Sequence, residues 1–137
     1  MLEEVDTRTL TANADTLSPN AAATTARTTD GNDLIRAVID NSLQTIDAID
    51  GGKGTDTLRA NVSATGTDAT AGTPGTAGTA DTNSIQPLMS NVEKVFINAT
   101  VTGGDGAVGT LAGGDATVNF SAADSTGIKE LWSEGST

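Results

Sequence analysis

The chain has 137 residues, of which 18 are acidic and 7 are basic, so its formal net charge is −11 and its sequence pI is about 4.1. A surface this negative repels phosphates and anionic lipids, and no apolar run is long enough to span a bilayer. We therefore expect neither nucleic-acid binding nor membrane insertion. The absence of cysteine excludes a disulfide framework and a thiolate metal site.

Residues 1–63 are the first of three segments in what we expect to be one structural domain. This segment is predicted to begin with one short strand around Leu10 and Ala12, followed by a loop. Glycine and aspartate residues then recur at short intervals through residues 28–60. The one candidate for a short helix is "SLQTIDAI" (42–49).

Residues 64–84, "ATGTDATAGTPGTAGTADTNS", are predicted to be a long low-complexity loop, because proline and glycine interrupt any period. In the third segment, 85–137, apolar and polar residues alternate in "KVFINATV" (94–101) and "ATVNFSA" (116–122), which predicts two strands. A third, shorter strand is predicted at "GIKELW" (127–132). With small and β-branched side chains and only 2% aromatic residues, the chain is predicted to be all-β.

The most informative stretch is "GGKGTDTL" (51–58), which matches the calcium-binding nonapeptide G-G-x-G-x-D-x-U at every specified position. Glycines such as Gly52 and Gly54 permit positive φ, so that carbonyl oxygens can turn toward a cation. Asp56 supplies a hard anionic oxygen, and Leu58 is predicted to point inward from a short strand. The motif therefore predicts part of a calcium shell.

A second, degenerate copy of the motif begins 23 residues earlier, in "TTDGNDLI" (28–35). It keeps Gly31, Asp33 and the inward-facing Ile35, but threonines replace the first pair of glycines. Because calcium needs about six to eight oxygen ligands, one turn is not enough and a partner turn must stack beside it. This copy is the predicted partner.

The stretch "SLQTIDAID" (42–50) lies between the two copies and keeps Asp47 and Ile49 in frame. We predict that it forms the rung on the opposite side of a β-roll. The spacing between the two turns equals two nonapeptides plus residues 37–41. These residues are predicted to bulge out and leave the turns stacked.

We expect a calcium ion between the two stacked turns, with Asp33 and Asp56 as its main ligands and Asp47 and Asp50 as further candidates. The complete predicted ligand set is Gly31, Asp33, Asp47, Asp50, Gly52, Gly54 and Asp56. The alternative is that these are ordinary turns that bind nothing, since glycine and aspartate are common turn formers.

Other residues carry weaker signals. A third glycine cluster, "TGGDGAVGT" (102–110), has Val108 where the motif needs aspartate, so we interpret it as a plain turn. Phe120 and Trp132 are predicted to be core residues or plugs between subunits. The chain has no histidine, cysteine or tyrosine to act beside its carboxylates, and we predict that it is not an enzyme.

The order of these motifs resembles the modules of bacterial surface-layer proteins and of large secreted repeats-in-toxin (RTX) surface proteins. The resemblance rests on "TLTANADTL", "TTDGNDLIRA", "IDAIDGGKGTDTL", "SNVEKVFI" and "GIKELW". It implies a calcium-stapled β-solenoid or β-roll-like module with Ca²⁺ as its cofactor, secreted to the cell surface by a type I exporter. It also allows a cell-surface polysaccharide as a partner.

From the motifs and the resemblance we expect a structural, self-assembling extracellular protein, a subunit or module of a surface layer or filament. We expect it to form a homo-oligomer or polymer through its β-edges and to be stabilised by calcium. Two alternatives stay open. The chain could instead be an adhesin repeat, or the noncatalytic secretion domain of a type I-exported RTX protein.

Overall fold

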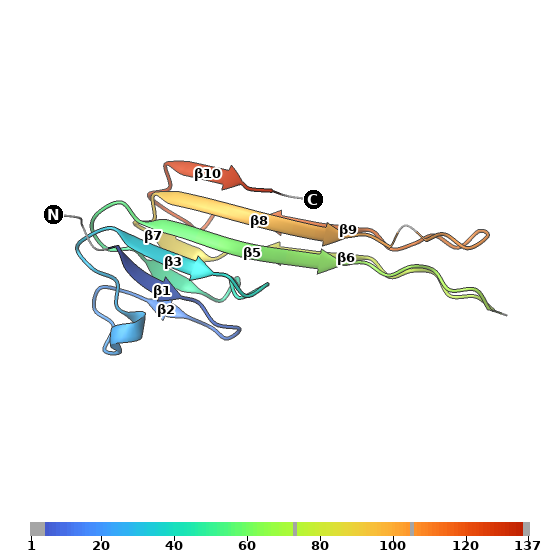
Figure 1. Cartoon of the computed structure of the whole chain (residues 1–137), viewed down its shortest axis with the longest axis horizontal. Helices are drawn as coiled ribbons and strands as arrows, with labels where there is room; N and C mark the ends of the chain where they lie inside the picture. The colour runs from blue at the N-terminus through green and yellow to red at the C-terminus, as the bar shows by residue number, and fades with distance from the viewer. Residues whose placement is uncertain (1–4, 73, 105, 136–137) are drawn as a thin grey trace.

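The computed structural model describes residues 5–72, 74–104 and 106–135. Parallel strands wind into a β-solenoid of about three turns with almost no helix, which confirms the predicted fold class. The broad sheet lies across the front of Figure 1. Its strands, in spatial order, are β1 (Asp6–Thr9), β3 (Asp33–Ala37), β5 (Thr57–Thr65), β8 (Lys94–Thr102) and β10 (Glu130–Ser133).

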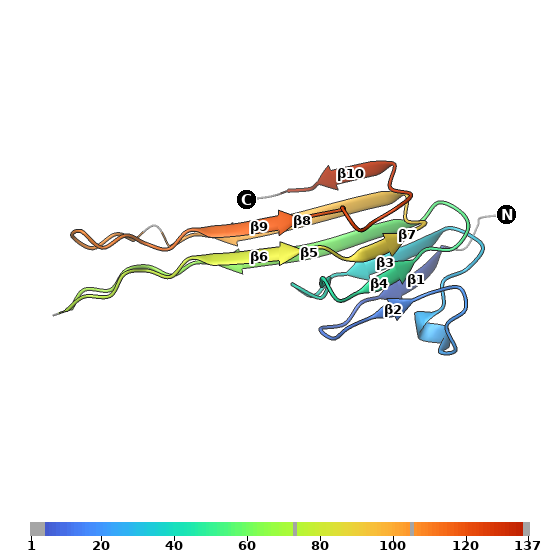
Figure 2. The ribbon, with the colours of Figure 1, turned by 180° about the vertical axis from the view of Figure 1, so that it is seen from behind.

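A second, shorter sheet lies behind the first and is visible in Figure 2. Its strands are β2 (Thr16–Leu17), β4 (Ala48–Asp50) and β7 (Leu88–Ser90), in that order. One coil of the solenoid therefore runs from β3 across to β4 and back to β5. β4 lies where the sequence predicted the opposite rung.

The prediction of a possible short helix at residues 42–49 is wrong. Residues 42–47 form turns and bends, and β4 begins at Ala48. Leu43 is 1% exposed and Ile49 is 2% exposed, so both side chains enter the core, one from a turn and one from a strand. Their spacing of six residues therefore reflects a coil that bends around the core and not one face of a helix.

The pairing of β3 with β5 follows the register that the motif spacing predicted. Ile35 lies opposite Leu58 in parallel register, and both side chains are 0% exposed. Of the residues predicted to bulge out, 37–41, Ala37 still belongs to β3 and is 0% exposed, so the chain leaves the coil only after it; Ile39 is 61% exposed. Asn41 then takes a positive φ of 61°, a conformation that asparagine tolerates better than most residues.

Inward-facing apolar side chains of successive coils stack on one another and form the core. Ile35, Leu58 and Val95 make one such column, and each of them is fully buried. Burial of a side chain of this size stabilises the fold by about 1.5–3 kcal/mol. The buried cluster consists of Leu10, Leu17, Ile35, Ala37, Leu43, Ile49, Leu58, Ala60, Val62, Ile85, Met89, Val92, Val95 and Ile97.

Two arms project from one side of the solenoid, because β5 and β8 continue past the coils (Figure 1). The chain returns along them through β6 (Asp81–Ile85) and β9 (Ala116–Phe120), which pair in parallel. The segment 64–84 thus begins in β5 and ends in β6. Backbone hydrogen bonds continue beyond the strands, for example from the N–H of Thr67 to the carbonyl of Thr79 (3.0 Å).

Glycines allow the chain segments of the arms to pack backbone against backbone. A Cβ atom on Gly104 would lie 1.9 Å from the carbonyl oxygen of Thr67, and one on Gly114 would lie 2.0 Å from the carbonyl carbon of Thr79. Only glycine fits at such positions. Asp105, within the third glycine cluster, lies outside the described residues.

The helical content of the described residues is one 3-10 turn, η1 (Thr24–Ala26). None of the helical structure in these residues is both long and apolar enough to cross a membrane.

Candidate functional site

Acidic residues lie in register at the starts of neighbouring strands of the broad sheet. Asp6 of β1, in register with Asp33, pairs with Arg8. The other three are joined by hydrogen bonds: Asp33 at β3, Asp56 before β5 and Glu93 before β8. The backbone N–H of Asp33 donates to Oδ1 of Asp56 (2.7 Å), and the N–H of Asp56 donates to Oε2 of Glu93 (2.8 Å). The carboxylates of Asp56 and Glu93 thus each bind the backbone of the preceding coil. We call these three residues the carboxylate ladder.

The glycine turn before β5 places Asp56 in this position. Gly52 and Gly54 have positive φ values of 95° and 113°, as the motif predicted. A Cβ atom on Gly51 would lie 2.0 Å from the carbonyl oxygen of Asn91 and 2.4 Å from Oδ2 of Asp56. The turn therefore needs glycine for its backbone conformation and for its close packing.

The two predicted turns stack directly on each other. A Cβ atom on Gly54 would lie 2.5 Å from the carbonyl oxygen of Gly31, and the N–H of Thr55 donates to Oδ1 of Asn32 (2.8 Å). Asp33 in turn accepts the N–H of Thr29 at Oδ2 (2.7 Å). The structure therefore brings together the two turns that the sequence paired.

The ladder buries negative charge that is only partly compensated. Asp33 is 1% exposed and Asp56 is 0% exposed, and Oδ1 of Asp33 and Oδ2 of Asp56 have no hydrogen-bond partner. Burial raises the pKa of Asp56 to about 6, because desolvation disfavours its charged form. The hydrogen bond from Asp33 opposes this rise, whereas the charges of Asp33, Glu93 and Asp50 add to it.

Asp47 does not join the ladder, because it lies on the short-sheet side, directly before β4. Its Oδ1 accepts the N–H of Asp15 (2.9 Å) and its Oδ2 accepts the N–H of Gln44 (2.7 Å). Burial raises its pKa as well, against the lowering effect of these two bonds. Both oxygens of this predicted ligand are thus occupied by backbone groups.

Asp50 lies at the end of β4, beside the glycine turn. Its Oδ1 accepts the N–H of Gly52 (3.1 Å) and the side-chain amide of Asn91 (2.8 Å). These bonds tie the turn to the next coil. Asp50 therefore acts on Asp56 through its charge, and its Oδ1 already has two donors.

The residues fit a calcium ion in part. The unpartnered oxygens of Asp33 and Asp56 are buried in adjacent turns, and hard carboxylate oxygens are the donors that calcium prefers. However, the other oxygen of each carboxylate accepts a backbone N–H. No group of three or more acidic side chains that could hold a metal occurs in the described ranges. A complete shell would need backbone carbonyls from the glycine turns.

Sequence reasoning missed Glu93. It lies 37 residues after Asp56, because the first arm intervenes, so the nonapeptide spacing does not reach it. A signal was nevertheless present: an acidic residue directly precedes the strand "KVFINATV", just as Asp56 directly precedes β5. The rule that finds it is the position of the acidic residue relative to the strand.

A second feature is the outer end of the stack at β10, which we call the β10 end. Leu131 lies in register with the buried Val95 and therefore faces inward, yet it is 53% exposed. It borders an open slot of about 200 Å³. The slot is lined by Ile97, Ala99, Val118, Phe120, Leu131, Trp132 and Ser133.

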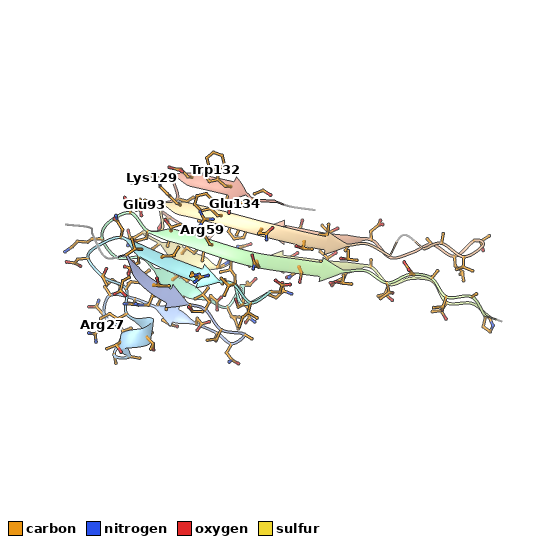
Figure 3. The ribbon with its side chains drawn as sticks, viewed as in Figure 1. Arg27, Arg59, Glu93, Lys129, Trp132 and Glu134 are labelled. Atoms are coloured by element: carbon orange, nitrogen blue, oxygen red, sulfur yellow. The ribbon has the colours of Figure 1, made fainter. Side chains whose placement is uncertain are left out.

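On the outer face of the broad sheet, side chains of three neighbouring strands stack in a row that ends at β10 (Figure 3). The guanidinium of Arg59 lies 4.3 Å from the ring centre of Phe96. The rings of Phe96 and Trp132 are stacked with their centres 6.4 Å apart. We call these three residues the ring stack.

No family model, curated protein or solved structure matches the chain.

Proposed function

We propose that the chain is a structural protein that associates with copies of itself through the β10 end, as a module of an extracellular surface layer or filament. One observation carries the proposal: among the residues that the structure describes, none covers the apolar interior of the solenoid beyond β10. Leu131 is 53% exposed over the slot, and the neighbouring Trp132, on the outer face of the sheet, is 54% exposed. Exposed apolar surface beside a strand edge is a feature of self-associating β-proteins.

We also propose that calcium stabilises this module through the carboxylate ladder. Asp33 and Asp56 would supply the charged oxygens, and carbonyl groups of the two glycine turns would complete the shell. The support is the pair of buried oxygens without a partner. A bound cation would offset the repulsion between these carboxylates and so fix the stacking of the coils.

Sedimentation velocity over a wide concentration range, in calcium and in chelator, tests self-association. The sedimentation coefficient should rise with concentration for the natural chain. It should stay at the monomer value for Leu131→Asp, because the charge would enter the apolar contact. Leu88→Asp is the matched control, since Leu88 is 57% exposed on β7. A natural chain that stays monomeric at every concentration in calcium would overturn the proposal.

A further inference from the structure

The two ends of the stack differ, and this difference limits how copies can join. At the β1 end, the inward-facing position in register with Ile35 is taken by Arg8, whose side chain is 11% exposed. The guanidinium of Arg8 binds the carboxylate of Asp6 (2.8 and 2.9 Å) and the carbonyl of Arg27. A charged group that is paired with a carboxylate thus covers the core at this end.

The residues around β2 and the loop that follows β2 add to this cover. Leu10 is 1% exposed and Leu17 is 4% exposed, and the adjoining loop is closed on itself by the bonds Ser18 N–H to Ala26 carbonyl (3.1 Å) and Thr28 N–H to Ser18 carbonyl (3.3 Å). The inward-facing positions at the β1 end are therefore covered by polar groups, and Val5, directly before β1, is an exposed apolar side chain at this end (52%).

A head-to-tail contact would set the β10 end against the β1 end of the next copy. Continuing the register would place Arg8 of one copy beside Leu131 of the other, since both align with the column of Ile35, Leu58 and Val95. The ion pair between Arg8 and Asp6 would then be buried against apolar atoms. That contact desolvates charge without a new partner and is unfavourable.

The β10 end is complementary to itself. None of the residues that line its slot is charged, so the apolar part of the contact holds no like charges. Glu130 and Glu134 flank it, and each already has a cationic partner, Lys94 for Glu130 (3.6 Å) and Arg59 for Glu134 (2.7 Å). Its strand edge also has no paired strand on the far side in the described part of the chain. A second β10 can therefore both cover the slot and extend the sheet.

The ring stack points to the same arrangement. Phe96 is covered by Arg59 on one side and by Trp132 on the other, whereas Trp132 is 54% exposed. Two β10 strands that run antiparallel and cross near Trp132 would bring this ring beside its counterpart and continue the stack. Aromatic pairs of this kind contribute beyond their buried area.

We propose, on the basis of the self-association put forward above, that two copies join β10 to β10 around a two-fold axis near Leu131 and Trp132. The contact is isologous, so it closes after two copies. It makes one solenoid of double length, with the polar β1 ends at its two tips. This dimer is the building unit from which any larger assembly would grow.

Trp132 is the only tryptophan of the chain, and it reports directly on the proposed contact. Dilution of the dimer should shift its emission to longer wavelength and increase quenching by acrylamide. Leu131→Asp should weaken the dimer at least about tenfold. Leu88→Asp should leave the dissociation constant unchanged. Thermal melting of both variants checks that they fold, and half-exposed Leu131 should tolerate the change in the monomer.

Cross-linking separates the two modes of joining, because the chain has no cysteine of its own. Leu131→Cys, close to the axis, should be joined to itself by a short bismaleimide. Thr7 and Glu130 occupy the same outward row of the sheet, so a mixture of Thr7→Cys and Glu130→Cys should give a mixed Thr7–Glu130 product only in a head-to-tail contact. We expect the first product and not the second.

The outcomes distinguish the two proposals. A natural chain that never associates would overturn the proposed function together with this inference. Association with a Thr7–Glu130 product, or association that Leu131→Asp leaves intact, would overturn the two-fold contact while self-association stands.

Discussion

The backbone N–H of Asp33 donates to Oδ1 of Asp56 across 2.7 Å, although the two residues are 23 positions apart in sequence. The bond joins consecutive coils at the turn, where the N–H needs an acceptor as the sheet begins. Asp56 and Glu93 repeat the arrangement one coil further on. This use of carboxylates fixes the stacking of the turns, and it also buries charge that a proton or a cation can compensate.

The raised pKa of Asp56 predicts how stability depends on pH in the presence of a chelator. Its folded pKa is about 6, above the ordinary 3.8, so the folded state holds more protons than the unfolded state between these values. The free energy of unfolding should therefore fall as the pH rises from about 4 to about 6, by up to about 3 kcal/mol, and stay low above that.

Asp56→Asn should remove most of this dependence, because the amide stays neutral and its oxygen can still accept the N–H of Asp33. Urea unfolding at a series of pH values measures it. Asp115→Asn is the control, since Asp115 is an exposed residue outside the ladder. Equal pH slopes in the natural chain and in Asp56→Asn would contradict the assignment.

Calcium should raise the melting temperature of the natural chain relative to a chelator, because a cation at the ladder binds only the folded state. Stabilisation of about 2.7 kcal/mol is expected when calcium is in hundredfold excess over its dissociation constant. Asp33→Asn and Asp56→Asn should each lose the response, while Asp115→Asn keeps it. Calorimetric melting curves that coincide in calcium and chelator would leave the ladder with a purely structural role.

Asp47→Ala should destabilise the fold equally with and without calcium. Its two oxygens bind the N–H groups of Asp15 and Gln44, and its side chain is 1% exposed, so the substitution leaves two donors without their acceptors. We expect a cost of about 2–4 kcal/mol in urea unfolding. A cost that appears only in calcium would instead mark Asp47 as a ligand.

Gly51→Ala should be strongly destabilising although no positive φ is involved. The added methyl group would lie 2.0 Å from the carbonyl oxygen of Asn91 and 2.4 Å from Oδ2 of Asp56. Separating the coils to relieve this contact should cost at least about 3 kcal/mol. Gly103→Ala is the matched control, because its Cβ would meet nothing within 4 Å. Thermal melts with equal midpoints would disprove the close packing.

Gly114→Ala should loosen the arms and leave the solenoid intact. Its Cβ would lie 2.0 Å from the carbonyl carbon of Thr79, whereas the core columns lie in the coils. In hydrogen exchange, the amides of Thr67 and Gly78 should lose protection, and that of Lys94 should keep it. Loss of protection throughout the chain would mean that arms and coils unfold together.

The sequence by itself determined the repeating unit of the fold. The motif residues Gly52, Gly54 and Asp56 specify a local turn. The turn needs glycine because of its backbone conformation, and the neighbouring residues of the motif are enough to predict that conformation. The alternation of inward and outward side chains around Leu58 specifies the strand that follows. Because both effects act within a few residues, the stacking of the two turns and the rung at β4 were predictable.

Only the tertiary structure decided which residues complete the ladder and which end of the stack is open. Glu93 accepts the N–H of Asp56 although an arm separates the two residues in sequence, and the local motif does not predict the length of that arm. Arg8 and Leu131 occupy equivalent inward positions, yet one lies under a paired, polar cover and the other lies half exposed over a slot. Burial depends on what lies on the adjacent coil, and that contact is made by residues far away in the sequence.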